Sequence, residues 1–475
     1  MTDGKSFFLV GIGGSGMMPL AAILKGRGAD VSGSDRGLDA GRVPAKFDYL
    51  RSLGIGLHPQ DGSGVQAGQI VVASAAVEDD VADIVRATQL GCQRMRRADL
   101  LAELLNAAKL SIAVGGTSGK STVTGMIGWI LHATGRDPSV MNGAVMTNFA
   151  GPDAAFASAL VGAGDAFVSE VDESDGSIAL YRPAIAVLNN VSLDHKSMDE
   201  LRTLFGDFLA RAETAIVNID NEEAAALAPA GAVTVAIDRD ADLRAINIAE
   251  QPFAVTFDLL ADGGITRISL AVPGRHNVSN ALAAIAAARA AGVSLPEAAA
   301  AITGFTGLKR RFELVGEANG VTVIDDFGHN PDKIAATLDT LRAFPGRLLI
   351  LFQPHGYGPL KVMRAELAAM FREKLGPEDV LVLPDPVYQG GTVTREVTSA
   401  DLIADISGNA RYIPDRAEAA AHLISITHPG DRIIVMGARD DTLSLLAREI
   451  VDKLAGHYIH DKASASGGPA RRDNG

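Results

Sequence analysis

The sequence has little cysteine, few aromatic residues and no excess of positive charge, and these shortages exclude several classes of protein. Its 475 residues include one cysteine, Cys92, which rules out an internal disulfide and suits a reducing compartment. The 43 basic and 57 acidic residues give a formal net charge of −14, which opposes binding to nucleic acid. No apolar run approaches the ~20 residues that span a bilayer. We therefore expect a cytoplasmic protein without a nucleic-acid partner or membrane insertion, either monomer or homodimer.

What the sequence does contain is an alternation of short apolar runs with helical patterns, which predicts βαβ units and parallel sheets. The chain is too long for one core, since cores stop growing at ~250 to 300 residues. Three series of strands begin at "SFFLVGI", "LSIAVGG" and "GVTVIDDFG". We predict an α/β fold of three serial domains: a Rossmann-like domain over residues 1–108, a central domain over 109–305, and a C-terminal Rossmann-like domain over 306–462. The polar residues 463–475 are predicted to be a disordered tail.

A glycine-rich turn follows the first predicted strand. Gly11, Gly13 and Gly16 have the G-x-G-x-x-G spacing, and Asp35 follows about 20 residues later at the end of the next strand. Such glycines let a diphosphate approach the backbone at a helix N-terminus, and the acid can accept ribose hydroxyls. The motif fits a nicotinamide cofactor and a UDP-sugar equally, and glycines required only for a tight turn are the structural alternative.

A second glycine-rich turn, "GGTSGKST" at 115–122, follows the strand "LSIAV" and opens a helix. Its end matches a phosphate-binding P-loop, but the glycine that usually begins the motif is replaced by Val114. Backbone amides and the helix dipole would face incoming phosphates. We expect Lys120 to hold the terminal phosphates of ATP and Ser121 to offer its hydroxyl to Mg²⁺.

Further polar residues follow other predicted strands. The stretch "SEVDESD" places four carboxylates together, from Glu170 to Asp175, which favours a bound metal ion or a solvated acidic loop. His195 follows the next strand as a metal ligand or a turn cap. Asn277 and Asn280 begin a helix, where they suit an adenine edge or capping. The last group is either an interdomain salt bridge or a cluster that closes over a nucleotide, and it comprises Arg310, Arg311, Asp325, Asp326 and His329.

In this order and spacing, the residues resemble the ATP-dependent Mur ligases over nearly the whole chain, with the alanine-adding branch nearest. The resemblance rests on "GIGGSGM", "RRADLLAELL", "GGTSGKST", "EVDESD", "GRHNVSNALAA", "RRFELVGE", "DDFGHNP" and "FQPH". It implies a ligase of peptidoglycan precursor synthesis that phosphorylates the carboxylate of a UDP-N-acetylmuramate-type substrate. An amino acid, expected to be L-alanine, then attacks the acyl phosphate to give an amide, ADP and phosphate.

The resemblance also implies a role for each domain and for particular residues. The first domain would bind the UDP substrate, the second ATP and the third the amino acid. The implied substrate-binding residues are Gly13, Ser15, Gly16, Asp35 and His355. The implied ATP-binding residues are Gly116, Thr117, Ser118, Gly119, Lys120, Ser121 and Thr122, with Asn280 at adenine, Arg311 at phosphate and Asp326 at the ATP ribose. Mg²⁺ would be held by Ser121, Glu170 and His195, and the implied catalytic residues are Lys120, Glu170, His195 and His329.

The sequence departs from the alanine-adding pattern after "FQPH". Two arginines that would bind the amino acid's carboxylate are replaced by a stretch from Gly356 to Pro359, and Lys361 is a displaced substitute. The amine acceptor therefore stays open. The alternatives are a paralogous Mur-like ligase with another amine or carboxylate, a nicotinamide-dependent oxidoreductase, and a non-catalytic UDP-sugar sensor.

Overall fold

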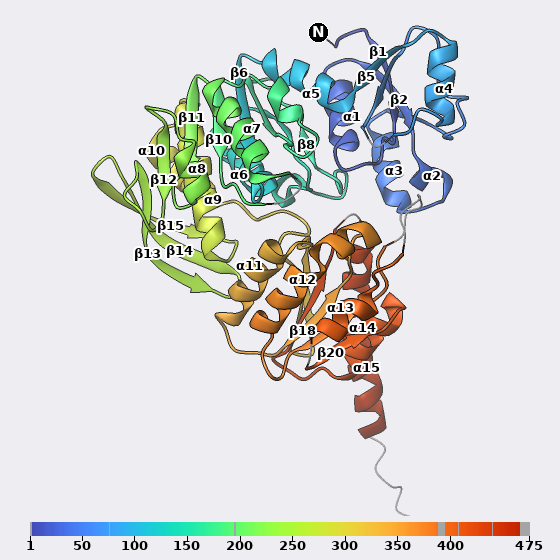
Figure 1. Ribbon diagram of the computed structural model, residues 1–475, viewed down its shortest axis with the longest axis vertical. Helices are drawn as coiled ribbons and strands as arrows, with labels where there is room; N and C mark the ends of the chain where they lie inside the picture. The colour runs from blue at the N-terminus through green and yellow to red at the C-terminus, as the bar shows by residue number, and fades with distance from the viewer. Residues whose placement is uncertain are drawn as a thin grey trace, which may run out of the picture. The chain divides into compact units, whose positions relative to one another are not determined.

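The computed structural model describes residues 2–75, 77–193, 196–387, 395–406, 408–438 and 440–465, with side chains up to residue 456. The chain divides into two compact units, Met1–Leu308 and Lys309–Gly475. The first unit contains two sheets and the second contains one (Figure 1). The predicted α/β class with parallel, Rossmann-like sheets at both ends of the chain is confirmed. The domain boundaries at residues 108, 305 and 462 stay predictions.

The N-terminal domain is a five-stranded parallel sheet of order β3-β2-β1-β4-β5. Its strands are β1 (Ser6–Val10), β2 (Asp30–Ser34), β3 (Gly56–His58), β4 (Ile70–Ala73) and β5 (Gln93–Arg96). Its helices are α1 (Met17–Gly26), α2 (Arg36–Asp39), α3 (Pro44–Ser52), α4 (Ala82–Gln89) and α5 (Arg97–Asn106). The central strand β1 is apolar and buried from Phe7 onward, as expected for a parallel strand covered on both faces.

The central domain has a ten-stranded sheet of order β15-β14-β13-β12-β11-β10-β6-β9-β7-β8. Its strands are β6 (Leu110–Gly115), β7 (Ser139–Met141), β8 (Ala159–Leu160), β9 (Ala166–Glu170), β10 (Ile185–Leu188), β11 (Thr214–Asn218), β12 (Val233–Ala236), β13 (Leu243–Gln251), β14 (Ala254–Ala261) and β15 (Gly264–Leu270). Its helices are α6 (Lys120–Ala133), α7 (Met198–Ala210), α8 (Glu222–Ala226), α9 (Arg275–Ala290) and α10 (Leu295–Ile302), with 3-10 turns η1 (Thr147–Phe149) and η2 (Ser177–Leu180).

Two kinds of strand pairing meet in this central sheet. Strands β7, β9, β6, β10, β11, β12 and β13 pair in parallel, whereas β13, β14 and β15 form an antiparallel meander. The meander was not predicted. In β14 partly buried and buried residues alternate, the period of a strand with one covered face. An apolar cluster that includes residues of α6, α9 and α10 packs with Val114 and Phe257 of this sheet.

A second apolar cluster joins the central sheet to the N-terminal domain. It includes Ala186 of β10, Phe205 of α7, Leu20 of α1 and Leu104 of α5. This shared core explains why residues from both predicted domains form one compact unit.

The second unit holds a six-stranded sheet of order β16-β17-β21-β18-β19-β20, in which only β16 is antiparallel among the described strands. Its strands are β16 (Glu313–Ala318), β17 (Val321–Asp326), β18 (Leu348–Phe352), β19 (Val380–Leu383), β20 (Ala410–Tyr412) and β21 (Arg432–Met436). Its helices are α11 (Pro331–Arg342), α12 (Tyr357–Lys374), α13 (Ser399–Asp405), α14 (Arg416–Ser425) and α15 (Leu443–Ala465). Most of the predicted tail, residues 466–475, lies outside the described residues.

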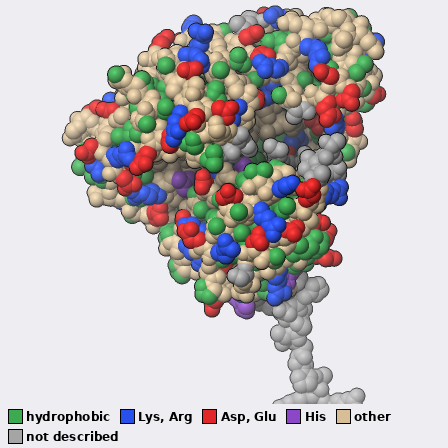
Figure 2. Space-filling view, viewed as in Figure 1, with side chains coloured by type: hydrophobic (Ala, Val, Ile, Leu, Met, Phe, Trp, Pro, Cys, Tyr) green, Lys and Arg blue, Asp and Glu red, His purple; other side chains and the backbone are tan. Residues whose placement is uncertain are grey.

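The surface of the described chain agrees with the composition. Acidic and basic side chains intermingle on the face seen in Figure 2, and this face shows no continuous basic surface of the kind that binds a polyanion. Among the described helices, none combines the length and the apolar character needed to cross a bilayer.

Candidate active site

The predicted phosphate loop lies between the end of β6 and the start of α6. Gly119 is the N-cap of α6 and has a φ of 82°, in the left-handed region that favours glycine. A Cβ at this position would lie 2.5 Å from Asn189 Nδ2 and 2.7 Å from Asn280 Oδ1. The turn therefore requires glycine both for its backbone conformation and for space.

Asn190, just beyond β10, fixes the shape of this loop. Its Oδ1 accepts hydrogen bonds from the Ser118 backbone N–H at 2.8 Å and from Thr117 Oγ1 at 2.9 Å. Its Nδ2 donates to the Ser118 carbonyl at 3.1 Å. One side-chain amide thus replaces the local hydrogen bonds that a tight turn cannot make for itself.

A chain of buried amides supports the loop from below. Asn189 Nδ2 donates to the Ser118 carbonyl at 3.1 Å and to Asn280 Oδ1 at 3.0 Å. Asn280 Nδ2 donates to Asn277 Oδ1 at 3.0 Å, and Asn277 Nδ2 donates to the Pro273 carbonyl at 2.7 Å. Asn280 is only 3% exposed. These bonds give Asn280 a positioning role beneath the loop, and its contact with adenine stays a prediction.

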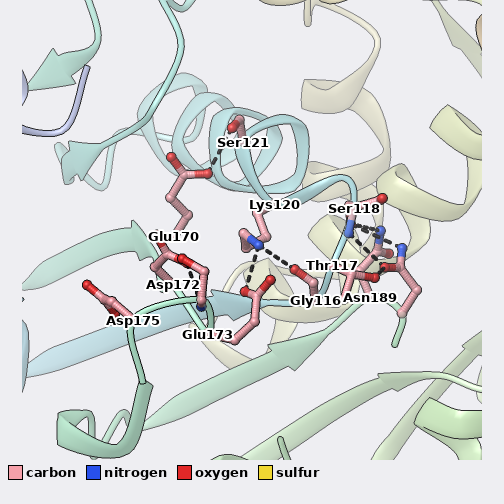
Figure 3. A network of polar contacts seen from close by, with 12 residues as sticks. Gly116, Thr117, Ser118, Lys120, Ser121, Glu170, Asp172, Glu173, Asp175 and Asn189 are labelled. Atoms are coloured by element: carbon pink, nitrogen blue, oxygen red, sulfur yellow. Dashed lines mark hydrogen bonds and ion pairs between the residues drawn. The ribbon is translucent and has the colours of Figure 1, made fainter. Parts of the chain in front are cut away.

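Lys120, the first residue of α6, turns its ammonium group back over the loop (Figure 3). Its Nζ donates to the Gly116 carbonyl at 2.6 Å and forms an ion pair with Glu173 Oε2 at 2.8 Å. The Glu173 side chain is 4% exposed and that of Lys120 is 19% exposed. A buried carboxylate requires such a partner. In this structure the charge of the predicted phosphate-binding lysine is therefore neutralised by Glu173.

Ser121 and Glu170 face each other on the other side of the first turn of α6. The Ser121 hydroxyl donates to Glu170 Oε2 at 2.8 Å, and Asn142 Nδ2 donates to the Ser121 carbonyl at 2.9 Å. A side chain at Gly143 would collide with the Glu170 carboxylate. The structure thus brings together two of the three predicted metal ligands, a hydroxyl and a carboxylate oxygen of the kind that Mg²⁺ prefers.

The third predicted ligand, His195, lies outside the described residues, as does Asp194. Within the described part of the chain there is no group of three or more His, Cys, Asp or Glu side chains placed to hold a metal ion. The site with Ser121 and Glu170 therefore stays a prediction.

The other two acids of the "EVDESD" stretch have local partners. Asp172 Oδ1 accepts from the Ser174 N–H at 2.9 Å and from the Ser174 hydroxyl at 2.7 Å. Burial acts to raise the pKa of Asp172, but these hydrogen bonds and the charges of Lys120 and Arg97 outweigh it, so the net shift is downward. Asp175 is exposed and lies away from Lys120 in Figure 3. Of the four acids in this stretch, Glu170 and Glu173 contact Ser121 and Lys120 directly.

The glycine loop of the N-terminal domain is tied to the end of β2. Gly13 N–H donates to Asp35 Oδ2 at 2.8 Å, Gly37 N–H donates to Asp35 Oδ1 at 2.7 Å, and Lys46 Nζ donates to the Gly13 carbonyl at 3.0 Å. Ser15 is exposed and Gly16 is the N-cap of α1. Each Asp35 oxygen keeps a lone pair for a ligand, and the predicted role of Asp35 toward ribose stays a prediction.

In the C-terminal unit, charged residues gather where β17 ends. Asp325 is fully buried, accepts from Ser444 Oγ at 2.7 Å and forms an ion pair with Arg310 at 3.5 Å. Burial raises the pKa of Asp325 to about 6, although Arg310 opposes this shift. Both partners belong to one unit, so this pair is not the interdomain salt bridge considered above. Asp326 accepts from the Phe312 and Gly328 N–H groups at 2.8 and 2.7 Å, which shapes the loop after β17.

Three aromatic rings, those of Phe327, His329 and His355, pack edge-on just after these carboxylates. The His329 ring packs edge-on against Phe327 and His355, with centroids 5.5 and 4.9 Å apart, and Arg311 lies 4.6 Å from the Phe327 centroid. Burial lowers the pKa of His329 to about 2, with a smaller contribution from Lys333. His329 Nδ1 is 3.0 Å from the Phe327 carbonyl, which can only accept. The neutral imidazole therefore carries its proton on Nδ1 and has its lone pair on Nε2.

Lys361, the displaced substitute for the missing arginines, has an acidic partner in this structure, and its proposed role stays a prediction. Its Nζ forms an ion pair with Glu396 Oε2 at 2.6 Å on the surface. Gly356 has a φ of 141° and starts α12 with no side-chain cap.

Sequence reasoning missed several residues that build the site. Asn189 and Asn190 were passed over, although two adjacent amides after a buried strand were visible in "AVLNNV". Asn142 had no signal in the sequence. Glu173 was one of four acids, and nothing local distinguished it as the partner of Lys120.

A glycine-rich loop at a strand-to-helix junction, with a lysine, a hydroxyl and facing carboxylates, defines an α/β enzyme that acts on nucleotide phosphates. Three family profiles match the chain: "Mur ligase family, catalytic domain" over residues 7–109, "Mur ligase middle domain" over 114–288, and "Mur ligase, glutamate ligase domain" over 310–439. The chain belongs to the Mur ligase family, the ATP-dependent ligases that form C–N bonds.

Individual relatives agree over nearly the full length. UDP-N-acetylmuramate–L-alanine ligase from Pelotomaculum thermopropionicum is 35% identical, with 93% of this chain and 96% of the relative covered. The enzyme of the same name from Streptomyces coelicolor is also 35% identical, covering 94% and 97%. Among solved structures, UDP-N-acetylmuramate-alanine ligase from Thermotoga maritima shares the fold with a TM-score of 0.75 at 23% identity, covering 97% of this chain and 100% of that one. A murein peptide ligase from Psychrobacter arcticus has a TM-score of 0.71 at 25% identity, covering 95% and 99%.

Proposed function

We propose that the protein joins L-alanine to the carboxylate of UDP-N-acetylmuramate at the expense of ATP, in peptidoglycan precursor synthesis. The observation that carries the proposal is the phosphate loop, where Lys120 and Ser121 begin α6 and face Glu173 and Glu170. The names of the full-length relatives supply the substrates. Because the reaction consumes ATP, we place it in the cytoplasm.

The proposed reaction has two covalent steps. A carboxylate oxygen of the UDP-sugar acid attacks the γ-phosphorus of ATP, the bond from that phosphorus to the bridging oxygen breaks, and ADP leaves. The amine nitrogen then attacks the carbonyl carbon of the acyl phosphate. Phosphate departs with one oxygen of the original carboxylate, and the nitrogen loses a proton. Such chemistry depends on positioning and on neutralising phosphate charge.

In the first step Lys120 leaves Glu173 and binds the terminal phosphates. The backbone N–H groups of Gly116 and Gly119 face the phosphate chain, whereas those of Thr117 and Ser118 donate to Asn190. Ser121 and Glu170 supply the oxygens for Mg²⁺, with His195 as the third proposed ligand. When bound, Mg²⁺ neutralises charge on the phosphate oxygens. Ser118 and Thr117 are held by Asn190, so the loop is formed before ATP arrives. Thr122 lies in the first turn of α6.

For the other sites, the proposal follows the predicted domains. The UDP group is assigned to the loop that contains Gly13, Ser15 and Gly16, beside Asp35. Arg311 and Asp326 are assigned to ATP, and His329 and His355 to the amine. Because burial lowers the pKa of His329 to about 2, its neutral ring is a weak base, and its Nε2 lone pair is suited to accept a hydrogen bond that orients the amine rather than to take up its proton.

The proposal is tested by following ADP and phosphate release with ATP, Mg²⁺, UDP-N-acetylmuramate and L-alanine. Release that requires both substrates, with an amide product of the expected mass, supports it. Failure of this pair to stimulate release overturns it.

A second candidate is a ligase of the same chemistry that takes a different amine. The stretch from Gly356 to Pro359 contains no guanidinium and Lys361 is paired with Glu396, whereas the Arg395 guanidinium lies 5.6 Å from the Tyr357 ring centroid. A carboxylate here would therefore meet a different set of cations from the two arginines of the alanine-adding pattern. Substituting glycine, L-serine and a short peptide for L-alanine in the assay distinguishes the two. The highest kcat/KM identifies the acceptor.

A further inference from the structure

Helix α5 begins with Arg97, whose side chain lies near the glycine loop at Gly16 and near Asp172 of the acidic stretch. The helix is fixed at its far end, where Asn106 Nδ2 donates to the Leu180 carbonyl at 2.9 Å and Asn106 Oδ1 accepts from the Arg182 N–H at 2.8 Å. Leu104 and Leu105 share one apolar core with Ile178 and Tyr181. Because the turn η2 directly follows the acidic stretch, this anchoring sets the position of Arg97, the first residue of α5.

The Arg97 side chain lies against the glycine loop. A Cβ built on Gly16 would be 3.0 Å from Arg97 Nη1 and 3.3 Å from its Cδ and Cζ. A side chain at position 16 would therefore require the guanidinium to shift by a few tenths of an ångström. The absence of a side chain at Gly16 thus lets the guanidinium lie directly against the glycine loop.

The Arg97 guanidinium is unpaired in this position. Within the described part of the chain it makes no hydrogen bond and no ion pair, whereas its neighbour Arg96 binds Asp99 at 2.7 Å. Ser15 and Gly16 also have backbone N–H groups without a partner among the described residues. A planar donor beside two free N–H groups matches the oxygens of a phosphate or a carboxylate.

The acidic stretch does not satisfy this arginine. Asp172 lies close enough for the charge of Arg97 to lower its pKa, yet no hydrogen bond or ion pair joins these two described residues, and Asp172 Oδ1 accepts two hydrogen bonds from Ser174. The positive charge of Arg97 therefore remains available to a ligand on the side of the glycine loop.

We propose that Arg97 binds anionic oxygens of the UDP-sugar acid, from its diphosphate or from its carboxylate, and so holds this substrate between the glycine loop and the phosphate loop. The assignment rests on the function proposed above. It adds a substrate-binding residue from α5 to the residues assigned to that site.

The test measures equilibrium binding of UDP, UDP-N-acetylglucosamine and UDP-N-acetylmuramate, without ATP, to the wild type and to Arg97→Ala, Arg97→Lys and Arg96→Ala. Arg96 is the matched control because it is adjacent, exposed and paired only with Asp99. We expect Arg97→Ala to weaken binding by about 10- to 100-fold, as for a lost charge-assisted hydrogen bond, and Arg97→Lys to restore part of it. Arg96→Ala should bind like the wild type.

The three ligands distinguish binding of Arg97 to the diphosphate from binding to the carboxylate. If Arg97 binds the diphosphate, all three lose affinity, whereas if it binds the carboxylate, only UDP-N-acetylmuramate does. In the full assay KM for the UDP-sugar should rise while KM for ATP stays constant. Wild-type affinity of Arg97→Ala for all three ligands overturns the proposal and leaves the ligase function standing. If the wild type binds none of them, both fail.

Discussion

The phosphate-loop region of the central domain and the charged cluster at the end of β17 both lie where parallel strands end, but they treat charge in opposite ways. In the first, Lys120 and Glu173 form an ion pair, and the Ser121 hydroxyl faces the Glu170 carboxylate. In the second, Asp325 is fully buried, and burial favours the neutral forms of Asp325 and His329. We infer that the first region receives the charged phosphates, whereas the second presents a neutral His329 ring beside a buried Asp325 and depends less on ionised side chains.

The largest effect is expected from Lys120→Ala, which removes the cation of the first region. Transition-state charge on the transferred phosphoryl group would lose its partner, so kcat for ADP formation should fall by about 10³-fold or more. Lys109→Ala is the control, because Lys109 is exposed and paired with Asp165. Near-normal ADP formation by Lys120→Ala would remove the distinction between the two regions.

Glu170→Gln should have the next largest effect. The amide keeps the shape of the side chain but loses the charge that would hold Mg²⁺ with Ser121. We expect kcat to fall by roughly 100-fold and the Mg²⁺ concentration for half-maximal rate to rise. A Mg²⁺ titration of ADP release measures both, with the surface variant Glu223→Gln as control. An unchanged Mg²⁺ requirement would place the metal elsewhere.

Glu173→Gln is expected to have a smaller effect in the opposite direction, because it should strengthen nucleotide binding. When Lys120 turns to phosphate, the buried Glu173 carboxylate loses its partner, which opposes nucleotide binding in the absence of a cation. The neutral amide removes this cost, so a non-hydrolysable ATP analogue should bind about tenfold more tightly in EDTA. Equal affinities of the variant and the wild type would show that the Lys120–Glu173 pair does not restrain the loop.

The smallest effects concern the pH dependence of stability in the second region. The folded-state pKa of Asp325 is raised to about 6, so its contribution to stability is complete below pH ~4 and is lost as pH rises through 6. The pKa of His329 is lowered to about 2, so its contribution is present above pH ~6.5 and is lost as pH falls. The two groups therefore act in opposite directions between pH 4 and 6.5.

Thermal unfolding of the full chain at pH 4.5, 5.5 and 6.5 measures these slopes. Relative to the wild type, Asp325→Asn should gain stability as pH rises and His329→Gln should gain stability as pH falls. Parallel curves for the wild type and both variants would show that these side chains titrate as they do in the unfolded chain.

The contrast between the regions also explains what the sequence could predict. The strands of the parallel sheets and the loop from Gly116 to Thr122 are encoded by contiguous residues, so local patterns were sufficient. The amide chain from Asn189 to Asn280 was not predictable, because it joins residues 91 positions apart. The same holds for Arg97 against Gly16. The antiparallel meander β13–β15 was missed because its alternating, half-covered strands lack the continuous apolar runs that marked the others.

The central claim is that the phosphate loop transfers the γ-phosphoryl group of ATP to a carboxylate. The most direct measurement uses UDP-N-acetylmuramate labelled with ¹⁸O in its carboxylate, with ATP, Mg²⁺ and L-alanine, and follows the released phosphate by ³¹P NMR. The account predicts that each phosphate carries one ¹⁸O from the carboxylate. Phosphate released with amide formation but without the label would contradict it.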